Sequence, residues 1–427
     1  MTSLSTTGST PAAVSIHNRW AQLLFGLVCM MAISSPQYVW TLFTKPLTAK
    51  FGVALSTLQI TFSLLIVLQT FFSPFQGSLV DRFGPRRLIT IGAILAGLSW
   101  VLAANVGSLY ALYLTYGVVG GLGTGIVYVG VVGHMVRWFP QQRGFAVGMV
   151  AAGYGMGAIL TTFPISSELA SLGLEQTLVR FGLIFAVVGA LAAQGLRQPK
   201  GLTASAATPS RAGAGQARDV GPSAMLREPI FWLMFVMMSM MSTSGLMVTS
   251  QMATFARDFG VASALVFGLA ALPLALTIDR LTNGLTRPFF GWISDRYGRE
   301  NTMFLAFALE GVAMALWLTL RDQPLAFVIM SGVVFFGWGE IFSLFPSTLT
   351  DTFGTANATV NYGWLYIAQG VGAIFGGPLA ALMHEKLGSW VPVFGTAITL
   401  DIITALLAIA LLKPWRLRYL HSRPTSC

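Results

Sequence analysis

The chain alternates long apolar runs with short polar or charged breaks, and no other feature of the sequence is as regular. A helix needs roughly 20 consecutive apolar residues to cross the hydrocarbon core of a bilayer, and twelve runs are about that long. They cover residues 20–43, 56–80, 88–105, 108–134, 144–166, 179–196, 230–255, 264–293, 302–320, 324–350, 360–383 and 391–413. The pattern therefore predicts an all-α integral membrane protein with twelve transmembrane helices.

A change of composition divides the runs into two sets of six. Residues 197–228 are rich in Ala, Gly, Ser and Pro and carry several cations, which is typical of a linker. We therefore expect a six-helix bundle at 19–196, a cytoplasmic linker at 197–228 and a second six-helix bundle at 229–413. Short cytoplasmic tails are expected at 1–18 and 414–427.

The charges fit a membrane protein and exclude a soluble enzyme of this length. Only 9% of the 427 residues are charged, whereas soluble domains carry about 25%. The net charge of +10 does not indicate nucleic acid, because the basic residues separate apolar runs instead of forming one stripe. Most of the 25 Lys and Arg residues fall in loops that are cytoplasmic if both termini are inside. The positive-inside rule therefore predicts that orientation in the lipid bilayer.

Residues that support cofactor or metal chemistry are sparse. Two cysteines and four scattered histidines provide neither a metal-ligand cluster nor a disulfide framework. The sequence has no phosphate-binding G-x-x-x-x-G-K-[ST] motif for ATP, and no clustered nucleophile or carboxylate pair. We therefore expect no cofactor, no ATP, no nucleic-acid partner and no enzymatic activity. A non-transporting membrane sensor is only a remote alternative, because the sequence shows no appended soluble domain and this argues against a sensor.

Several charged residues fall inside predicted spans, where a charge is costly and is usually functional. Arg280 and Arg287 are separated by about 700° of helical rotation, so they share one face of the eighth span with Asn283. An arginine fork matches a carboxylate bidentately and keeps its proton. This face is therefore a candidate anion site, and a buried ion pair between Arg280 and Asp279 is the structural alternative. The other charges predicted inside spans are Glu310, Glu340 and Asp401.

The two halves repeat one motif. Residues 77–84 (GSLVDRFG) recur as residues 291–298 (GWISDRYG), about half the chain later. Both copies lie at the inner end of the second span of their half. Such a repeat predicts two pseudo-symmetric six-helix bundles around a site near the middle of the membrane.

The repeated G-x-x-x-D-R-[FY]-G motif resembles the signature loop of the major facilitator superfamily. That resemblance implies a conformational latch at the cytoplasmic face. The latch would be made by the charged residues Asp81, Arg82, Asp295 and Arg296. The first copy departs from the usual form, because Pro85 stands where a basic residue is common.

Further strings resemble the oxalate:formate antiporter family, which is akin to proton-linked monocarboxylate transporters. They are NRW at 18–20, PQYVWTL at 36–42, GIVY at 125–128, RWFPQQRG at 137–144, AGYG at 152–155, RPF at 287–289, LFPSTLTDTFG at 344–354 and NYG at 361–363. The resemblance covers essentially the whole chain. It implies a secondary transporter that exchanges small carboxylates, oxalate against formate, by alternating access in a bacterial inner membrane.

The resemblance also implies a binding chamber. Arg287 matches the substrate-binding arginine of the family, and Tyr366 stands where the family often has tryptophan. The positions that match the lining of the family's carboxylate site are Tyr38, Tyr128, Tyr154 and Trp338. Tyrosine hydroxyl groups can donate to carboxylate oxygens while their rings exclude water. Gln37, next to Tyr38, adds a further donor.

One position departs from the family pattern and leaves the coupling open. Gln369 stands where the best-known pattern has a lysine, so the second cation for a dicarboxylate is missing. Arg280 is then the candidate second cation, and Glu340 affects the charge balance. The alternative function is proton-coupled symport of a monocarboxylate such as lactate or formate, with Asp279 or Glu340 carrying the proton.

Overall fold

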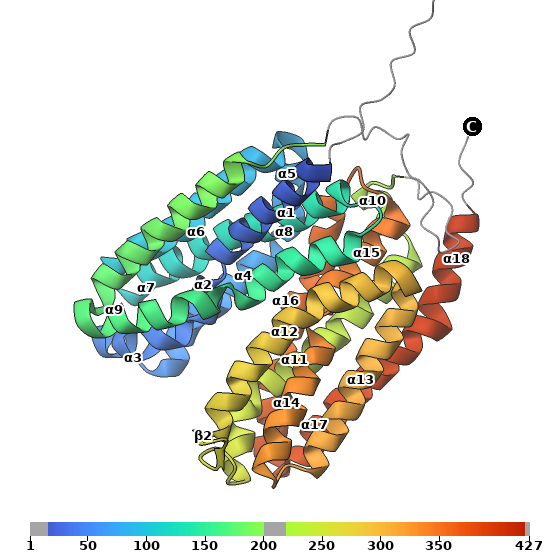
Figure 1. The fold of residues 1–427 in the computed structure, drawn as a ribbon. Coiled ribbons are helices and arrows are strands. Elements are labelled where there is room, and N and C mark those ends of the chain that lie inside the picture. The colour runs from blue at the N-terminus through green and yellow to red at the C-terminus, as the bar shows by residue number, and fades with distance from the viewer. Residues whose placement is uncertain (1–15, 200–218, 423–427) are drawn as a thin grey trace, which may run out of the picture.

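A computed structural model describes residues 16–199 and 219–422. Most of the predicted N-terminal tail and linker, and the last five residues, lie outside the described residues. The first half of the chain, up to Gln194, is helical throughout apart from short connections (Figure 1). Its elements are α1 (Ile16–Ala32), α2 (Ser35–Tyr38), α3 (Trp40–Phe51), α4 (Leu55–Phe71), α5 (Ser73–Phe83), α6 (Pro85–Ala104), α7 (Leu109–Leu112), the π-helical η1 (Tyr113–Val119), α8 (Gly120–Trp138) and α9 (Arg143–Gln194).

The second half is also helical, with one small hairpin. Its elements are α10 (Pro222–Met225), α11 (Pro229–Asp258), β1 (Leu265–Val266), β2 (Leu269–Ala270), α12 (Ala271–Tyr297), α13 (Arg299–Thr319), α14 (Pro324–Trp338), α15 (Ile341–Phe353), α16 (Ala358–Leu387), α17 (Trp390–Leu407), the π-helical η2 (Ala408–Leu412) and α18 (Lys413–His421). The two halves form two helical bundles that lie side by side (Figure 1).

The helices account for twelve membrane crossings within the described residues. Eight are long and apolar enough by themselves, and the bent pairs α1–α2 with α3 and α4 with α5 supply two more. The 52-residue α9 is two crossings, because Gly173 interrupts it with φ 82°. α12 completes the set, although its charged residues make it less apolar. The structure thus has the predicted number of crossings.

Two local features differ from the sequence prediction. The connection expected between 166 and 179 is helical except at Gly173, since glycine alone there adopts the non-helical, positive-φ conformation. The eighth crossing begins at Ala271 and not at 264, because a hairpin precedes it. Phe267 and Gly268 both have positive φ at the turn of that hairpin, as a two-residue type I′ connection requires.

The segment predicted as the C-terminal tail is helical where the structure describes it. From 414 onward α18 continues to His421 without a break. Its start lies directly after the π-helical segment η2. The end of α18 and the start of α1 lie at the same end of the molecule, beside α10 (Figure 1).

The repeated motif shapes this same end in both halves. Gly84 (φ 87°) and Gly298 (φ 94°) each end a helix and start the next with nearly the same backbone turn. Both values lie in the region that glycine adopts without a Cβ penalty. We call the end of the molecule that carries these two turns the motif end.

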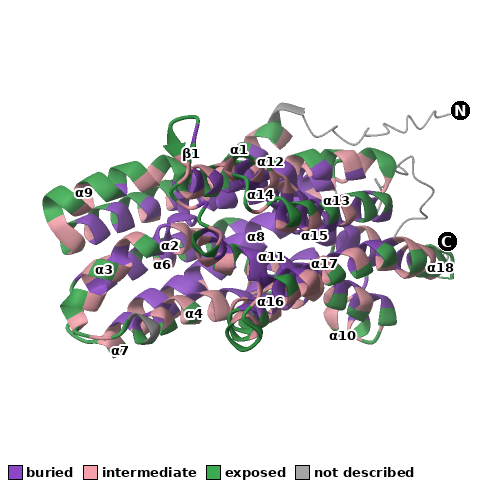
Figure 2. Ribbon diagram, turned by 90° about the horizontal axis from the view of Figure 1, so that it is seen from below, coloured by how far each residue is buried: buried purple, intermediate pink, exposed green. Residues whose placement is uncertain are grey.

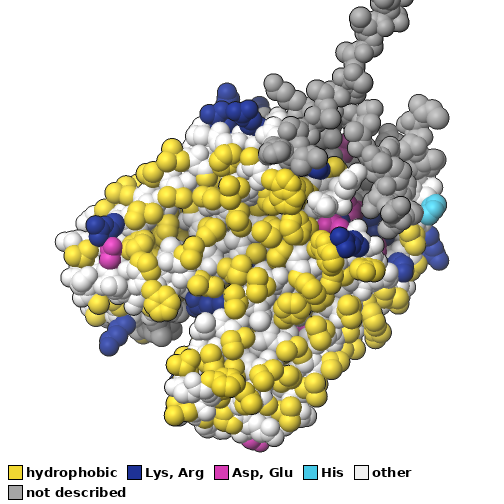
Figure 3. Space-filling view, viewed as in Figure 1, with side chains coloured by type: hydrophobic (Ala, Val, Ile, Leu, Met, Phe, Trp, Pro, Cys, Tyr) yellow, Lys and Arg dark blue, Asp and Glu magenta, His cyan; other side chains and the backbone are white. Residues whose placement is uncertain are grey.

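The surface and the core have the distribution expected in lipid. Exposed residues follow the outward faces of the helices, and buried residues face the inside of the bundles (Figure 2). The outer surface is largely hydrophobic, including Phe163 at 80% exposure and Leu191 at 67% (Figure 3). Such wide apolar exposure is unusual for a soluble monomer and is expected of a surface in contact with acyl chains.

The bundles meet at the motif end and separate toward the other end. Figure 3 shows a hollow between them that opens away from the motif end. At the closed end the backbones of the two bundles are in close contact. A Cβ atom added to Gly77 would lie 2.7 Å from the carbonyl oxygen of Thr359, and Gly144 and Gly291 touch across the bundles. Side chains at these glycines would hold the bundles apart.

Candidate functional site

Arg287 lies on α12 at the contact between the bundles and is only 1% exposed. Its Nη2 donates to Asn283 Oδ1 at 2.8 Å, and its Nη1 donates to the carbonyl oxygen of Ala151 on α9 at 2.8 Å. The guanidinium carbon lies 4.5 Å from the ring centre of Phe342. Arg287 therefore lies in the interior and not against lipid, and the contact to Ala151 links it to the first bundle.

The predicted face of α12 is only partly assembled. Asn283 and Arg287 lie together in the interior, whereas Arg280 is exposed. Asp279 is 4% exposed, and neither of its carboxylate oxygens accepts a regular hydrogen bond from another described residue. Among the described residues no ion pair joins Asp279 to Arg280, so the structural alternative of mutual neutralisation is absent here.

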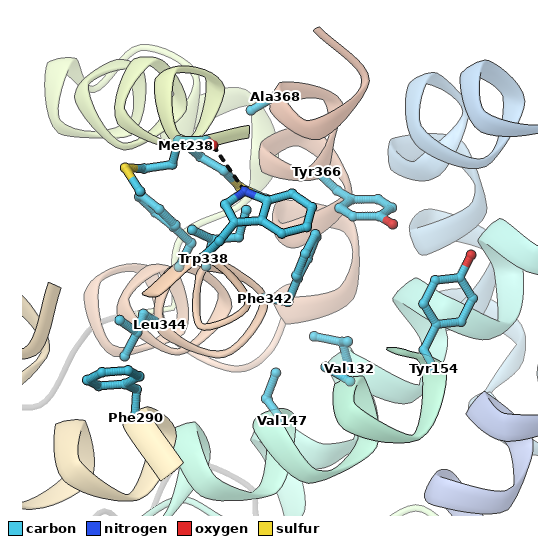
Figure 4. Packing of buried hydrophobic residues seen from close by; sticks show 14 of the residues in the cluster. Val132, Val147, Tyr154, Met238, Phe290, Trp338, Phe342, Leu344, Tyr366 and Ala368 are labelled. Atoms are coloured by element: carbon cyan, nitrogen blue, oxygen red, sulfur yellow. Dashed lines mark hydrogen bonds between the residues drawn. The ribbon is translucent and has the colours of Figure 1, made fainter. Parts of the chain in front are cut away.

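Four tyrosines form a continuous series of ring contacts across the two bundles. Tyr38 and Tyr154 have ring centres 5.5 Å apart, and Tyr154 and Tyr128 are 5.1 Å apart. Tyr128 stacks on Tyr366 of α16 at 4.8 Å. Figure 4 shows Tyr154 and Tyr366 facing one another from the two bundles. The structure therefore brings these four predicted residues together.

Amide side chains connect the tyrosine hydroxyl groups. Tyr154 donates to Gln37 Oε1, as a short hydrogen bond. Gln69 of α4 donates from Nε2 to the hydroxyl oxygens of Tyr154 at 3.2 Å and Tyr366 at 3.0 Å. The hydroxyl group of Tyr128 is buried beside those of Tyr362 and Tyr366, and it forms no regular hydrogen bond with another described residue. The chamber thus combines a cation, several hydroxyl donors and apolar ring faces, as a small carboxylate requires.

Trp338 and Gln369 lie on the second bundle beside this chamber. Trp338 donates from Nε1 to the carbonyl oxygen of Met241 at 3.1 Å, and its ring packs against Phe342 (Figure 4). Gln369 is half-buried, and its Oε1 has no hydrogen-bond partner. It lies nearly one helical turn after Tyr366, so it remains a candidate polar group near Tyr366 on a similar face of α16.

Glu340 lies with other acids inside the second bundle. It is fully buried at the break between α14 and α15. Glu310 of α13 packs against Gly337, and Asp401 of α17 packs against Gly311. Within the described part of the chain, no carboxylate oxygen of these three acids accepts a regular hydrogen bond. The structure thus groups three of the predicted intramembrane charges.

The motif residue Asp81 ties the first bundle to the second. Its carboxylate contacts Arg137 of α8 at 2.5 Å and accepts a hydrogen bond from the backbone N–H of Val360 on α16 at 3.2 Å. Arg137 also donates to the carbonyl oxygens of Thr355 and Ala356, at 3.1 and 3.2 Å. This pair therefore holds the loop between α15 and α16 in the other bundle.

Asp295 is the equivalent aspartate in the second bundle, and it contacts the first bundle. It accepts hydrogen bonds from the backbone N–H groups of Gly144 and Phe145, at 3.0 and 2.9 Å, where α9 starts. Arg299 lies 2.6 Å from the same carboxylate. A carboxylate at a helix N-terminus is favourable because the unpaired N–H groups and the helix dipole are positive there.

Asp351 of α15 completes the contact at the motif end. It forms ion pairs with Arg299 of its own bundle at 2.8 Å and with Arg143 of the first bundle, the latter a short contact. Both arginines are mostly buried. The sequence analysis did not select Asp351 or the arginines that pair with it and with the motif acids, although each lies in a string that resembles the family or directly beside the motif. These arginines are Arg137, Arg143 and Arg299.

Arg82 and Arg296 are placed differently from their aspartate neighbours. Both are exposed, and they lie over the rings of Phe83 at 5.3 Å and Trp292 at 3.9 Å. Neither takes part in an ion pair with another described residue. Their contribution to the latch therefore stays a prediction, whereas the aspartates make the contacts between bundles in this structure.

Two buried arrangements now point to one kind of protein: a pair of bundles joined by a repeated acidic motif, and a cationic chamber between them. The sequence profile of the Major Facilitator Superfamily matches residues 21–278 and 270–425. The chain belongs to the Major Facilitator Superfamily. It is therefore a multi-pass membrane transporter with the twelve-helix, two-bundle fold of that superfamily, and not an enzyme.

Individual relatives place this major facilitator protein more narrowly. The oxalate:formate antiporter of Oxalobacter formigenes is 34% identical over 402 residues, which cover 93% of this chain and 91% of that protein. The predicted membership in the oxalate:formate antiporter family is confirmed. Monocarboxylate transporter 13 of Bos taurus is 25% identical over 342 residues, which cover 78% of this chain and 75% of that protein. The substrates of the chain are accordingly small anions.

A solved structure shows the same fold in a more distant major facilitator protein. The proton:xylose symporter XylE bound to 6-bromo-6-deoxy-D-glucose aligns with a TM-score of 0.68, covering 93% of this chain and 96% of that one. Its sequence identity is 13%. The likeness therefore concerns the arrangement of the helices alone.

Gln69 is the chamber residue that the sequence analysis missed. Gln69 and Asn283 are separated by the same number of residues as Asp81 and Asp295. The two amides therefore occupy equivalent positions in the two halves of this major facilitator protein. Extending the repeat of the motif toward the N-terminus could have found it. Without that extension, Gln69 looked like one polar residue within an apolar span.

Proposed function

We propose that this protein exchanges small carboxylates, oxalate against formate, across a bacterial inner membrane. The observation that carries the proposal is the buried Arg287, which lies beside the hydroxyl groups of a tyrosine-lined chamber. A buried guanidinium favours an anionic ligand, and its planar fork matches a carboxylate. The oxalate:formate antiporter relative supports the choice of substrates.

The contacts of Arg287 suggest how binding is linked to movement of the bundles. Its Nη1 donates to Ala151 of the opposite bundle. An anion that enters through the hollow between the bundles competes with this carbonyl oxygen for the guanidinium. Binding therefore replaces a contact between the bundles by contacts to substrate, and alternating access follows as the two bundles rock about the site.

Counterflow into proteoliposomes tests this function. Purified protein is reconstituted into vesicles loaded with unlabelled formate, and uptake of labelled oxalate is followed. Exchange predicts rapid uptake that requires internal carboxylate, and competition by a panel of unlabelled carboxylates defines the substrate class. Equal uptake into empty and formate-loaded vesicles would contradict exchange.

Proton-coupled symport of a monocarboxylate is the second candidate function. It is favoured by Asp279 and Glu340, two buried carboxyl groups whose oxygens accept no regular hydrogen bond from another described residue. A pH-sensitive dye inside the same vesicles separates the two functions. Symport acidifies the lumen as lactate or formate enters, whereas exchange leaves the lumenal pH unchanged.

The orientation is tested separately from the substrate. We predict that both termini, and hence the motif end, face the cytoplasm, because loops on that side carry most of the Lys and Arg residues. A reporter fused after Leu420 should be active only in the cytoplasm. Activity of the same fusion in the periplasm would reverse the assigned orientation.

The preference for a dianion should follow the number of cations near the site. We predict that Gln369→Lys raises the ratio of oxalate to formate affinity about tenfold, because a unit charge acts about twice as strongly on a dianion as on a monoanion. Arg280→Gln should lower the same ratio. Competition of each anion against labelled oxalate measures both changes. If neither ratio changes, neither position contributes to the charge that selects the substrate.

A further inference from the structure

Gln69 joins the two bundles at the level of the chamber. It lies on α4 and is 1% exposed. One amide nitrogen donates to Tyr154 in its own bundle and to Tyr366 in the other, at 3.2 and 3.0 Å. A buried amide that donates to two hydroxyl oxygens fixes the direction of both hydroxyl groups, because a hydroxyl oxygen that accepts still has its own proton to donate.

The two hydroxyl groups differ in where that proton can go. Tyr154 donates to Gln37 Oε1 in a short hydrogen bond, and Gln69 Oε1 lies 3.3 Å away as a second acceptor. Tyr366 is only 3% exposed, and its hydroxyl group interacts with that of Tyr128, on which it stacks. The chamber thus presents neighbouring hydroxyl donors to which an anion can bind.

The repeat gives Gln69 a counterpart with a complementary role. Asn283 occupies the equivalent position in the second half and accepts from Arg287 through its amide oxygen at 2.8 Å. It thereby fixes the plane of the cationic fork. Gln69 uses its amide nitrogen instead, and so fixes the direction of a hydroxyl group. Each half of the molecule therefore contributes one buried amide that orients one anion-binding donor.

We propose that Gln69 is a positioning residue for the substrate carboxylate. By donating to Tyr366, it keeps the proton of that hydroxyl group directed at the anion, and so raises the affinity through Tyr366. This inference rests on the proposed carboxylate transport. It adds a residue from the first bundle, so that oriented donors from both halves meet at one substrate.

A double-mutant cycle tests the role of Gln69. The variants are Gln69→Met, which keeps the length of the side chain without its amide, Tyr366→Phe, and the two combined. We expect each single variant to raise the half-saturating oxalate concentration about tenfold with little change in the maximal rate. The combined variant should be no weaker than Tyr366→Phe alone, because Gln69 acts through a hydroxyl group that is already absent.

Further variants distinguish orientation from simple packing. Gln69→Glu keeps the shape but provides only acceptors, so it should weaken oxalate binding more than Gln69→Met does. Gln22→Met is the matched control: Gln22 is also 1% exposed and hydrogen-bonds His134 and the backbone, but it lies away from the chamber. Its half-saturating concentration should remain that of the wild type.

The outcomes separate this inference from the function on which it rests. Independent, additive effects of Gln69→Met and Tyr366→Phe would overturn the positioning role alone, as would an equal loss in Gln22→Met. If the wild-type protein moves no carboxylate in the same vesicles, the proposed function is overturned and the positioning role with it.

Discussion

Arg287→Gln is expected to abolish carboxylate exchange while the protein stays folded in the membrane. The substitution removes the buried cation of the chamber and the fork that donates to both Asn283 and Ala151. Loss of one partner from a buried, charge-assisted interaction costs about 3–5 kcal/mol, which corresponds to roughly 100- to 4,000-fold in affinity. Initial rates of oxalate uptake, normalised to the amount of reconstituted protein, measure the effect.

Arg287→Lys should restore little of that activity. An ammonium group is a point charge and cannot donate along two parallel directions in one plane. The matched control is Arg321→Gln: Arg321 donates to the carbonyl oxygen of Leu318 and lies over the ring of Phe259, so it has similar contacts outside the chamber. We expect wild-type rates from this control. Near-normal uptake by Arg287→Gln would remove the residue from the site.

Arg287 also contacts the opposite bundle, so loss of transport has two possible origins. If the residue binds the anion, oxalate should no longer raise the melting temperature of Arg287→Gln in detergent. If it only links the bundles through Ala151, oxalate should still stabilise the variant although transport is lost.

Periodicity and charge position predicted most of the fold because lipid imposes simple rules. A crossing needs about 20 apolar residues, so the length of the runs suffices to count the crossings. Local backbone geometry is harder to predict from the sequence. The break at Gly173 depends on one positive φ value and the turn at Phe267 and Gly268 on two, which an apolar pattern does not encode.

The chamber was predictable only where one residue carries the signal. Arg287 was found because a charge at bilayer depth is conspicuous by itself. Gln69 was not, since its significance arises from Tyr366, almost 300 positions later in the chain. The same holds for Asp351, whose two arginine partners come from different bundles. Residues defined by distant partners need the three-dimensional arrangement.

Asp351→Asn should open the motif end of the molecule. Asp351 is the acid that Arg143 and Arg299 share across the bundles, and both arginines are mostly buried. Arg299 keeps Asp295, but Arg143 has, among the described residues, only one other hydrogen bond, to the carbonyl oxygen of Val136 at 3.3 Å. The neutral amide of Asp351→Asn leaves Arg143 and Arg299 facing each other. Asp295 is then the one carboxylate that offsets their two positive charges, where there had been two. We expect the closed state to lose about 3 kcal/mol, as for other broken buried pairs.

Cysteine labelling measures this opening directly. In a background with Cys29 and Cys427 replaced by Ala, Thr359→Cys places a thiol where α16 contacts Gly133 of the first bundle. Thr359 is fully buried and its hydroxyl group has no partner, so the substitution breaks no hydrogen bond. A membrane-impermeant maleimide should label this thiol slowly in the parent and at least tenfold faster with Asp351→Asn. Glu175→Gln, which breaks the exposed pair with Lys50, should leave the rate unchanged.

A second substitution distinguishes electrostatic repulsion from a simple lost contact. If the closed state fails because Arg143 is left without its acid, Arg143→Gln combined with Asp351→Asn should label more slowly than Asp351→Asn alone, since removing both members of a buried pair costs less than removing one. If the ion pair acts only as a mechanical tie, the double variant should label at least as fast as the single one. Equal labelling of Asp351→Asn and its parent would instead show that the aspartates of the repeated motif, Asp81 and Asp295, hold the bundles together without it. In that case the closed end depends on carboxylates at the N-termini of α9 and α16, and Asp295→Asn should be the variant that opens it.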